Sequence, residues 1–497
     1  MKTFVLKIAA GAVRVLAALA GVFARRRDGI ALISCQGDKP SQDILNLEIE
    51  LKKLLREQDR RSAHGRAAGQ NVPHGRAIDP GSPHDRAINP GSPHIHVVAG
   101  RMRRSVGGAV LFIGRLLSML RAVAASRVVV IDAFCLAVSI PKKRPGQKVV
   151  QIWHAPEAIK KFSQQILDTQ AGYKSRTAEI LCMHRGYDYI LCPADATLPF
   201  FSEAFGYPEN VFVKYGLPSL DRIGLMKRPA PGEGETPERV TARSAIHARY
   251  PVLREGAGGR PLTIVYAPTF RDGDHSAGST GNSADAAGPT GNSADAVGLV
   301  RAFVEALDKT IDSGKEMRDC RGGASPLPEM TKPEINAGAI DEKLPRIALV
   351  LKLHPLDPGY PGSGEGDSCI APSASPAPFA LKDKEFPLTD WYAAADVIIT
   401  DYSGVAVEAA AAGVASYYYV YDIDDYKARR GLNVDLREEA VGKYAFMDAG
   451  ALARQVLRDF SNGGYDYDAL AAFRGKYLET PLSGNARALA AFIAGLA

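Results

Sequence analysis

The sequence lacks the signatures of several enzyme classes. It has no Walker phosphate-binding loop, no GxSxG nucleophile elbow and no HExxH metalloprotease motif. Its six cysteines are scattered, with neither a CxxC pair nor metal-ligand spacing, which favours a reduced, cytoplasmic compartment over a disulfide framework. A net charge of +6 over 497 residues is small and gives no indication of nucleic-acid binding. We therefore expect no metal, no redox cofactor and no nucleic-acid partner.

The bulk composition is that of a soluble globular protein, with 46% hydrophobic and 23% charged residues. A chain of 497 residues exceeds one ordinary hydrophobic core, so two domains are expected. The positive charge is unevenly placed. Residues 97–150 contain ten Lys and Arg but one acid, Asp132. Positive charge beside apolar sequence suits an anionic partner such as a membrane surface.

Residues 1–27 form an apolar segment that ends in three arginines. Lys7 and Arg14 interrupt it, and both are costly inside a bilayer. We predict a helix that lies on a membrane surface, because apolar residues recur at helical spacing. These are Val5, Ile8, Ala12, Val15, Leu19 and Val22. A cleaved signal peptide, a membrane span and an ordinary core helix are the alternatives. The apolar segment 110–125 is open to two interpretations, shallow membrane insertion or a helix buried against its sheet.

Low-complexity tracts interrupt the chain. Residues 64–93 contain three related ten-residue units that begin with HGRAA, HGRAI and HDRAI, and residues 277–296 repeat AGSTGNSADA as AGPTGNSADA. We expect solvated, disordered insertions at 63–96, 274–297 and 360–380. The first tract spaces histidines ten residues apart, but its Pro and Gly content argues against a metal site.

Without these tracts, strands alternate with helices. The predicted strands are 29–34, 128–131, 149–152, 187–192, 210–214, 262–267, 347–353, 397–400 and 415–420, and the predicted helices include 45–56, 109–125 and 158–163. Two runs of this alternation predict two Rossmann-type parallel-sheet domains, at 28–225 and 226–497. Ligands of such folds bind at the carboxyl ends of the strands, so we expect the site in a cleft between the two domains.

Two histidines end strands in different halves of the chain. His154 follows strand 149–152 in the sequence VVQIWHAPEAIKKF, and His354 precedes Pro355 in LKLHP. Each histidine alone is typical of a structural position. Together across a cleft they would serve as general base and phosphate stabiliser, because imidazole titrates near neutral pH.

The segment IITDYSGVAVEAAAAG, residues 398–413, runs from a strand into an alanine-rich helix. Ser403 is a good N-cap, and Gly404 would leave the first helical amides open to a phosphate. Glu408 would accept ribose hydroxyls or face solvent. The alternative is that Ser403 only caps the helix. Lys352 would add fixed positive charge or lie exposed on its strand. The acids at 422–425 would bind a divalent ion or form a solvated turn.

Taken in order, the motifs QIWHAPEAIKKF, YAPTFRD, LKLHP and TDYSGVAVE resemble those of the CDP-glycerol glycerophosphotransferase family, over residues 29–477. The WHA and AIKKF sequences are more similar to members that add the first units to a lipid-linked primer. The resemblance implies a GT-B-like fold. By this resemblance, the first domain would dock peripherally on the cytoplasmic face of the membrane and receive a lipid-linked saccharide, and the second would hold CDP-glycerol. The reaction that the resemblance implies is attack by an acceptor hydroxyl on the polyol-phosphate phosphorus, with release of CMP.

The resemblance also assigns residues. It makes His154 and His354 catalytic, and it places the donor against Ala155, Pro156, Glu157, Ala158, Ser219, Thr269, Phe270, Arg271, Asp401, Ser403, Gly404 and Glu408. Three positions depart from the family pattern: Ser219 replaces an arginine, Gly404 a second serine and Glu408 an aspartate. Another CDP-polyol is therefore an alternative donor. A GT-B glycosyltransferase using a nucleotide sugar and a catalytically impaired binding protein are the alternative functions.

Overall fold

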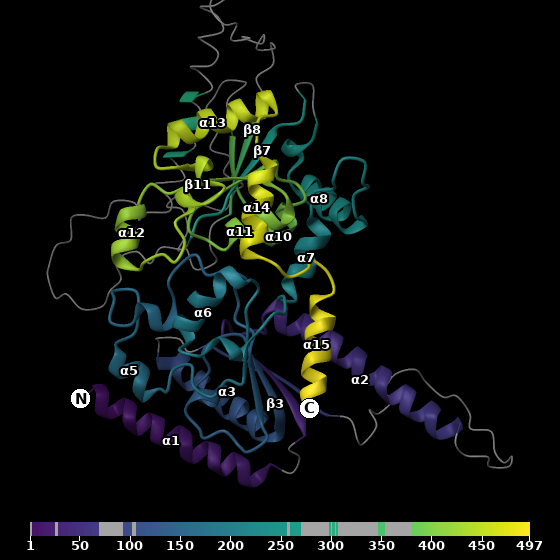
Figure 1. The fold of residues 1–497 in the computed structure, drawn as a ribbon, viewed down its shortest axis with the longest axis vertical. Helices are drawn as coiled ribbons and strands as arrows, with labels where there is room; N and C mark the ends of the chain where they lie inside the picture. The colour runs from purple at the N-terminus through teal and green to yellow at the C-terminus, as the bar shows by residue number, and fades with distance from the viewer. Residues whose placement is uncertain are drawn as a thin grey trace, which may run out of the picture. The chain divides into compact units, whose positions relative to one another are not determined.

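The structure is a computed structural model. It describes residues 2–24, 28–68, 93–101, 106–255, 259–269, 298–299, 301–303, 305–306, 346–352 and 379–497. The chain forms two compact units (Figure 1). The first consists of Met1–Gly224, Ala428–Asn433 and Lys476–Ala497, and the second of Leu225–Lys427 and Val434–Gly475. Each unit contains a six-stranded parallel sheet, which confirms the predicted two-sheet, GT-B-like α/β fold.

The first sheet has the order β2-β1-β3-β4-β5-β6. Its strands are β1 Gly29–Ser34, β2 Ile95–Ala99, β3 Ser126–Ile131, β4 Lys148–Gln151, β5 Tyr189–Leu191 and β6 Phe212–Val213. Every residue of β1 is buried, as expected for a central strand of a parallel sheet covered on both faces. The helices that lie wholly or mainly in this unit are α1 Lys2–Phe23, α2 Gln42–Ala68, α3 Val106–Ala125, α4 Leu136–Ser139, α5 Ser175–Ile180, α6 Leu198–Phe205, α7 Ser219–Met226 and α15 Asn485–Leu496.

The second sheet has the order β12-β11-β10-β7-β8-β9. Its strands are β7 Leu262–Tyr266, β8 Ile347–Leu351, β9 Phe379–Lys382, β10 Val397–Thr400, β11 Ala415–Tyr419 and β12 Ala445–Phe446. The helices that lie wholly or mainly in this unit are α8 Pro237–Arg249, α10 Leu388–Trp391, α11 Val405–Ala412, α12 Ile423–Arg429, α13 Ala449–Asn462 and α14 Tyr467–Tyr477. The predicted strand at 397–400 is reproduced residue for residue.

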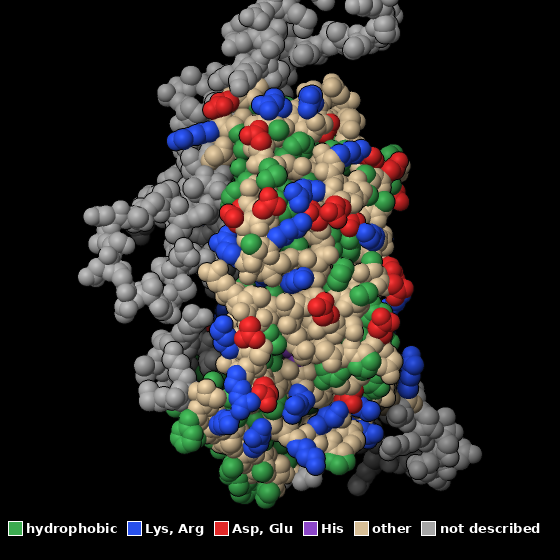
Figure 2. All heavy atoms as spheres, turned by 60° about the vertical axis from the view of Figure 1, so that its left-hand side comes forward, with side chains coloured by type: hydrophobic (Ala, Val, Ile, Leu, Met, Phe, Trp, Pro, Cys, Tyr) green, Lys and Arg blue, Asp and Glu red, His purple; other side chains and the backbone are tan. Residues whose placement is uncertain are grey.

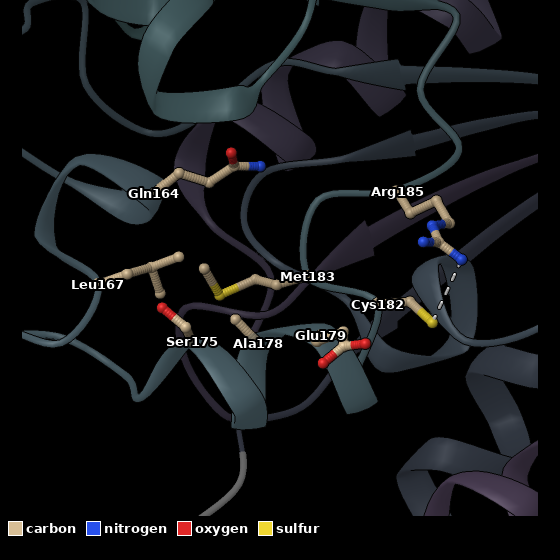
Figure 3. A pocket seen from close by; sticks show the side chains of 8 residues that line it. All are labelled: Gln164, Leu167, Ser175, Ala178, Glu179, Cys182, Met183 and Arg185. Carbon is tan, nitrogen blue, oxygen red and sulfur yellow. Dashed lines mark hydrogen bonds between the residues drawn. The ribbon is translucent and has the colours of Figure 1, made fainter.

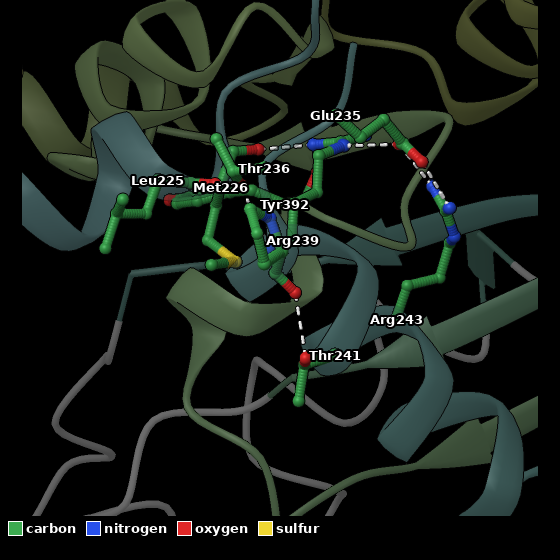
Figure 4. Close-up of polar contacts among 9 residues, drawn as sticks. Leu225, Met226, Glu235, Thr236, Arg239, Thr241, Arg243 and Tyr392 are labelled. Carbon is green, nitrogen blue, oxygen red and sulfur yellow. Dashed lines mark hydrogen bonds and ion pairs between the residues drawn. The ribbon is translucent and has the colours of Figure 1, made fainter.

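A buried arginine fixes the start of the second unit (Figure 4). The Arg239 guanidinium donates to the backbone carbonyls of Met226 and of Tyr392, the latter at 3.0 Å. It also pairs with Glu235 at 2.9 Å. Glu235 bonds Arg243 as well, and this pair of arginines lowers the pKa of Glu235 to about 2. Arg239 therefore connects the segment before α8 to the end of α10.

Several boundaries differ from those that the sequence predicts. The compact units divide the chain differently from the predicted domain 226–497, because Ala428–Asn433 and Lys476–Ala497 lie in the first unit. The last segment packs there because α15 lies on α2 and because Asp221 accepts hydrogen bonds from the backbone amides of Asn485 and Ala486, at 2.8 and 3.0 Å. The predicted strand 210–214 shrinks to Phe212–Val213.

Two of the three predicted insertions are narrower in the structure. Helix α2 continues to Ala68 and β2 begins at Ile95, so the first insertion is narrower than 63–96. Strand β9 likewise enters the predicted insertion 360–380 at Phe379. The rest of these tracts, with 274–297, lies outside the described residues. The acidic residues 422–425 lie in a turn and the start of the helix that follows it. Asp424 and Asp425 lie in the first turn of α12, and Asp422 accepts a hydrogen bond from the Tyr402 hydroxyl at 3.2 Å.

Helix α1 has two different apolar faces. Its small residues Ala10 and Val13 are buried in the core of the first unit, and the helix packs on α3, α4 and α5. The residues Val5, Ile8, Val15, Leu19 and Val22 face outward, with exposed fractions between 49% and 75%. Hydrophobic side chains gather at the lower edge of the face in Figure 2, at the height of α1, with Lys and Arg side chains around them. Thr3–Phe23 is also long and apolar enough to cross a membrane, by length and composition alone.

Helix α3 contains the apolar segment 110–125, for which the sequence left shallow membrane insertion and burial against the sheet open. It packs against β1, β2 and β3, and α1 contacts it as well. Leu116, Met119 and Leu120 are buried in the core, although Leu111 and Ile113 remain exposed. Most of α3 is therefore a Rossmann-type helix covering its sheet, and α1 presents the larger apolar surface to solvent.

Candidate active site

The carboxyl end of β4 turns sharply at Trp153. This residue has a φ of 59°, in the left-handed region that a bulky residue rarely adopts. The Gln151 side-chain oxygen accepts its backbone N–H at 2.8 Å, and the indole packs on Phe162 and Phe205, with ring centroids 5.1 and 5.3 Å away. Trp153 thus serves as a packing residue that fixes the strained turn immediately before His154.

The turn leaves His154 open to solvent, with its Nδ1 atom 3.3 Å from the backbone carbonyl of Asp132. A carbonyl only accepts, so Nδ1 carries the proton and Nε2 keeps its lone pair. Partial loss of water on the packed side of the ring lowers the pKa of His154, and the charge of Lys160 acts in the same direction. A neutral imidazole with a free Nε2 lone pair has the form that a general base requires.

The segment after His154 is not the predicted helix 158–163. Residue Lys160 instead forms an isolated antiparallel bridge with Leu432, and the first helical turn is the 3-10 helix Ser163–Ile166. The side chains of Pro156, Glu157 and Ala158 are buried. Glu157 accepts the Ile159 amide at 2.6 Å, and burial raises its pKa. Ala155 is half-buried. These residues therefore shape the loop that carries His154.

The strap Ala428–Asn433 holds this loop. Asn433 donates to the Ala158 carbonyl at 3.0 Å and accepts from the Gln165 amide at 2.8 Å. Arg430 donates to the Lys161 carbonyl at 3.1 Å. Gly431 has a φ of +89°, and a Cβ there would lie 2.7 Å from the side chain of Lys161. The strap thus needs a glycine where it crosses the loop. Sequence reasoning missed it, because its partners lie some 270 positions earlier.

A buried acid lies at the start of α2 in the same unit. Asp43 accepts the backbone N–H of Ser219 at 2.7 Å, so the predicted donor contact Ser219 is bonded within the protein. Burial raises the pKa of Asp43 to about 6, and the negative charges of Asp132 and Asp221 add to the shift. Asp132 in turn accepts the Ser34 hydroxyl at 2.6 Å. Sequence reasoning missed Asp43, whose position in a first helical turn resembles ordinary helix chemistry.

The second unit brings two predicted contacts together at adjacent strand ends. Strands β7 and β10 are hydrogen-bonded neighbours. Thr269 follows β7 and Asp401 follows β10. One carboxylate oxygen of Asp401 accepts both the backbone N–H of Thr269, at 2.8 Å, and its hydroxyl, at 2.7 Å. Both residues are buried. Asp401 therefore fixes the loop that leads to Phe270 and Arg271, which lie outside the described residues.

The start of α11 differs from the prediction. Gly404, and not Ser403, is the N-cap of helix Val405–Ala412. The Ser403 side-chain oxygen accepts the Val405 amide at 3.4 Å, and its carbonyl accepts the Ala406 amide at 3.0 Å. The amides of the first turn thus have partners within the protein. Only the long contact to Val405 is weak enough to yield easily to a better acceptor.

Glu408 lies on the same helix and is partly exposed. It accepts the hydroxyl of Tyr392 at 3.0 Å. Tyr392 is fully buried, and this burial, together with the charge of Glu408, raises the tyrosine pKa well above its ordinary value. The tyrosine therefore stays protonated and donates to Glu408, which fixes the orientation of the carboxylate.

Lys352 is not exposed on its strand, and its positive charge is paired within the second unit. Its ammonium lies 2.9 Å from Asp383, and the two side chains are 14% and 0% exposed. Asp383 also accepts from the Trp391 indole and the Tyr250 hydroxyl, each at 2.8 Å. Burial alone would raise the pKa of Asp383, but these donors together lower it. His354 follows two positions later, outside the described residues. Within the described part of the chain, no group of three His, Cys, Asp or Glu residues is placed to hold a metal ion.

The two parallel-sheet units, with polar side chains at their strand ends, define a GT-B-like α/β protein. The chain belongs to the family described as CDP-Glycerol:Poly(glycerophosphate) glycerophosphotransferase, which matches residues 94–306 and 323–493. The resemblance predicted from the motifs is confirmed.

Individual relatives are more distant. The teichoic acid ribitol-phosphate primase of Bacillus spizizenii is 24% identical over 330 residues, covering 66% of this chain and 66% of that protein. The teichoic acid glycerol-phosphate primase of Bacillus subtilis is 22% identical over 337 residues, covering 68% and 66%. The matches thus span slightly less than two thirds of these relatives. The structure of the wall teichoic acid polymerase TagF is similar with a TM-score of 0.55 and 14% identity, covering 99% of this chain and 97% of that one; this likeness concerns the fold alone.

Proposed function

We propose that this protein transfers glycerol phosphate, or another polyol phosphate, from a CDP-polyol to a hydroxyl of a membrane-linked saccharide acceptor. The family membership supports the reaction class. The observation that carries the proposal is the state of His154, a neutral imidazole whose Nδ1 faces a carbonyl and whose Nε2 keeps its lone pair.

In this reaction the acceptor oxygen attacks the phosphorus that carries the polyol. The bond from that phosphorus to the bridging oxygen breaks, and CMP leaves with the electron pair. The proton of the acceptor hydroxyl passes to Nε2 of His154. His354 is assigned to the stabilisation of phosphate charge.

We assign donor binding to the second unit. Thr269 and Asp401 shape one strand-end loop, and the positive end of the α11 dipole near Ser403 and Gly404 favours a diphosphate. Glu408, oriented by Tyr392, would accept hydroxyls of the ribose or the polyol. The curated relatives include both ribitol-phosphate and glycerol-phosphate primases, so both CDP-alcohols are candidate donors.

The test is CMP release from a panel of CDP-alcohols that includes CDP-glycerol and CDP-ribitol, with a lipid-linked saccharide as acceptor. His154→Ala and His354→Ala should each lower the rate by about 10²–10⁴-fold, the scale of a lost general base, with unchanged thermal unfolding. His247→Ala is the matched control on α8 and should keep full activity. Full turnover by the His154 variant would overturn the assignment. Release of UDP or GDP from a nucleotide sugar would make the protein a glycosyltransferase instead.

Attachment to the cytoplasmic face of the membrane is the second part of the proposal. The outward apolar residues of α1 suit insertion among lipid chains, and the exposed Lys7 and Arg14 suit anionic headgroups. Vesicles containing anionic phospholipid should float the protein. The double variant Val15→Asp with Leu19→Asp should lose most binding, whereas Lys53→Asp on α2 should not. Equal flotation of all three proteins would reject α1 as the anchor.

A further inference from the structure

Backbone strain in this protein is concentrated in one stretch. Among the described residues, the non-glycine residues with positive φ are Trp153, Ser163, Asp168, Cys182 and His184, with values between 51° and 62°. All lie between β4 and β5, from the residue before His154 onward. Such conformations cost about 1–3 kcal/mol each and cluster at functional sites. The clustered strain therefore marks residues 153–184 as a candidate functional segment.

The stretch lines an open pocket of about 220 Å³, shown in Figure 3. It is lined by Gln164, Leu167, Ser175, Ala178, Glu179, Cys182, Met183 and Arg185. One wall comes from the 3-10 helix Ser163–Ile166 and the residue that follows it, and the other from α5. Asp168 closes the connecting loop by accepting the Ser175 amide at 3.0 Å. The strained residues Asp168 and Cys182 thus hold two ends of the pocket wall.

The lining suits a hydroxyl-rich ligand. Gln164, Ser175, Glu179 and Arg185 are exposed. Each has one partner within the protein, in turn Phe205, Asp168, Arg176 and Cys182, and keeps further donor or acceptor positions for a ligand. The apolar side chains of Leu167, Ala178 and Met183 offer a surface for the face of a sugar ring. Sites that enclose larger ligands measure about 300–1,000 Å³, so this pocket is too small for a CDP-alcohol and fits one sugar residue.

The pocket also lies beside the apolar helix α1. Helix α5 packs directly on α1. The Arg14 guanidinium of α1 reaches the Cys182 sulfur at 3.9 Å, and Arg185 reaches the same sulfur at 3.8 Å. A molecule anchored in the membrane beneath α1 would therefore meet this pocket close to its lipid linkage.

We propose that this pocket binds a sugar residue of the membrane-linked acceptor. The inference rests on the proposed transferase function and deepens it, because it names a site for the acceptor that is separate from the donor residues of the second unit.

The experiment uses the full chain and a disaccharide linked to a short alkyl chain as the probe. Ala178→Leu fills the floor of the pocket, and Glu179→Gln with Arg185→Gln removes two polar partners on exposed positions. Both variants should weaken calorimetric binding of the probe and raise the acceptor KM at least tenfold, with kcat and the donor KM within twofold of the wild-type values. Lys174→Gln, next to α5 but outside the lining, is the control and should match the wild type.

Unchanged probe binding and acceptor KM in both pocket variants would overturn the pocket assignment while leaving the transferase function standing. If no CDP-alcohol yields CMP, the transferase proposal fails, and the binding measurement without donor still decides the pocket. Loss of binding in the exposed double variant, with unchanged thermal unfolding, would support the assignment even if Ala178→Leu fails to fold.

Discussion

A single carboxylate oxygen of Asp401 accepts two hydrogen bonds from Thr269, one from its amide at 2.8 Å and one from its hydroxyl at 2.7 Å. The two residues are 132 positions apart and lie at the ends of neighbouring strands. Because both are buried, this contact ties the strand-end loop after β7 to the loop before α11. The geometry of the candidate donor site in the second unit depends on it.

Two substitutions of Asp401 test its contact with Thr269. Asp401→Ala leaves the buried Thr269 amide without a partner and should cost about 2–4 kcal/mol of unfolding free energy. The donor KM should rise about tenfold, since lost positioning of the loop weakens binding by a hydrogen-bond-sized amount. Asp401→Asn keeps an acceptor oxygen and should cost less than half as much. Denaturant unfolding and donor titrations check both values. Equal effects of the two variants would show that the acceptor oxygen at position 401 does not hold Thr269 in place.

The strap Ala428–Asn433 leads to a prediction about catalysis. Asn433→Ala removes the contacts to the Ala158 carbonyl and the Gln165 amide, which support the loop after His154. We expect about tenfold lower kcat, equal to about 1.4 kcal/mol of barrier, with little change in donor KM. The exposed Asn462→Ala at the end of α13 is the control. A raised donor KM with unaltered kcat would assign the strap to binding instead of to the positioning of His154.

Asp43 predicts a pH dependence of stability. Its pKa is about 6 in the folded protein against an ordinary 3.8, because burial penalises the carboxylate. The folded state therefore binds the proton more tightly. The resulting stabilisation is complete below about pH 4 and is lost as the pH rises through 6. At 1.36 kcal/mol per pKa unit the full effect is about 3 kcal/mol.

Asp43→Asn mimics the protonated acid and keeps an oxygen for the Ser219 amide. The variant should lack the decline in thermal midpoint between pH 4 and 6, and at pH 7 it should be the more stable protein. Asp59→Asn, a partly exposed acid of the same helix, should keep the wild-type profile. A persistent decline in Asp43→Asn would show that another group titrates.

The ion pair of Lys352 and Asp383 predicts a large loss of stability. Lys352→Met leaves a fully buried carboxylate without its cation and should cost about 3–5 kcal/mol. Lys427→Met removes the more exposed partner of Asp435, where Arg437 remains as a second cation, and should cost about 0–1 kcal/mol. Denaturant unfolding of both variants measures the contrast. Similar losses would mean that burial does not distinguish the two pairs.

Much of the fold follows from local sequence. Central strands such as β1, β10 and the last four residues of β3 are largely apolar runs, which a parallel sheet buried on both faces requires. The helical spacing of Val5, Ile8, Ala12, Val15, Leu19 and Val22 predicted one face of α1, and all six residues lie on its exposed side. The edge strands β2, β9 and β12 were missed because they are short and defined mainly by pairing with a neighbour.

The sequence by itself determined the two runs of strand–helix alternation, the apolar stripe of α1 and the motifs that name the family. Tertiary structure decided what the polar residues do. The Ser219 amide donates a hydrogen bond to Asp43, and Lys352 forms a buried ion pair with Asp383. The segment after His154 is extended because the strap of residues 428–433 pairs with it. The physical reason is range. Periodicity and capping act over a few residues, whereas the partners named here lie between 31 and about 270 positions away in the sequence.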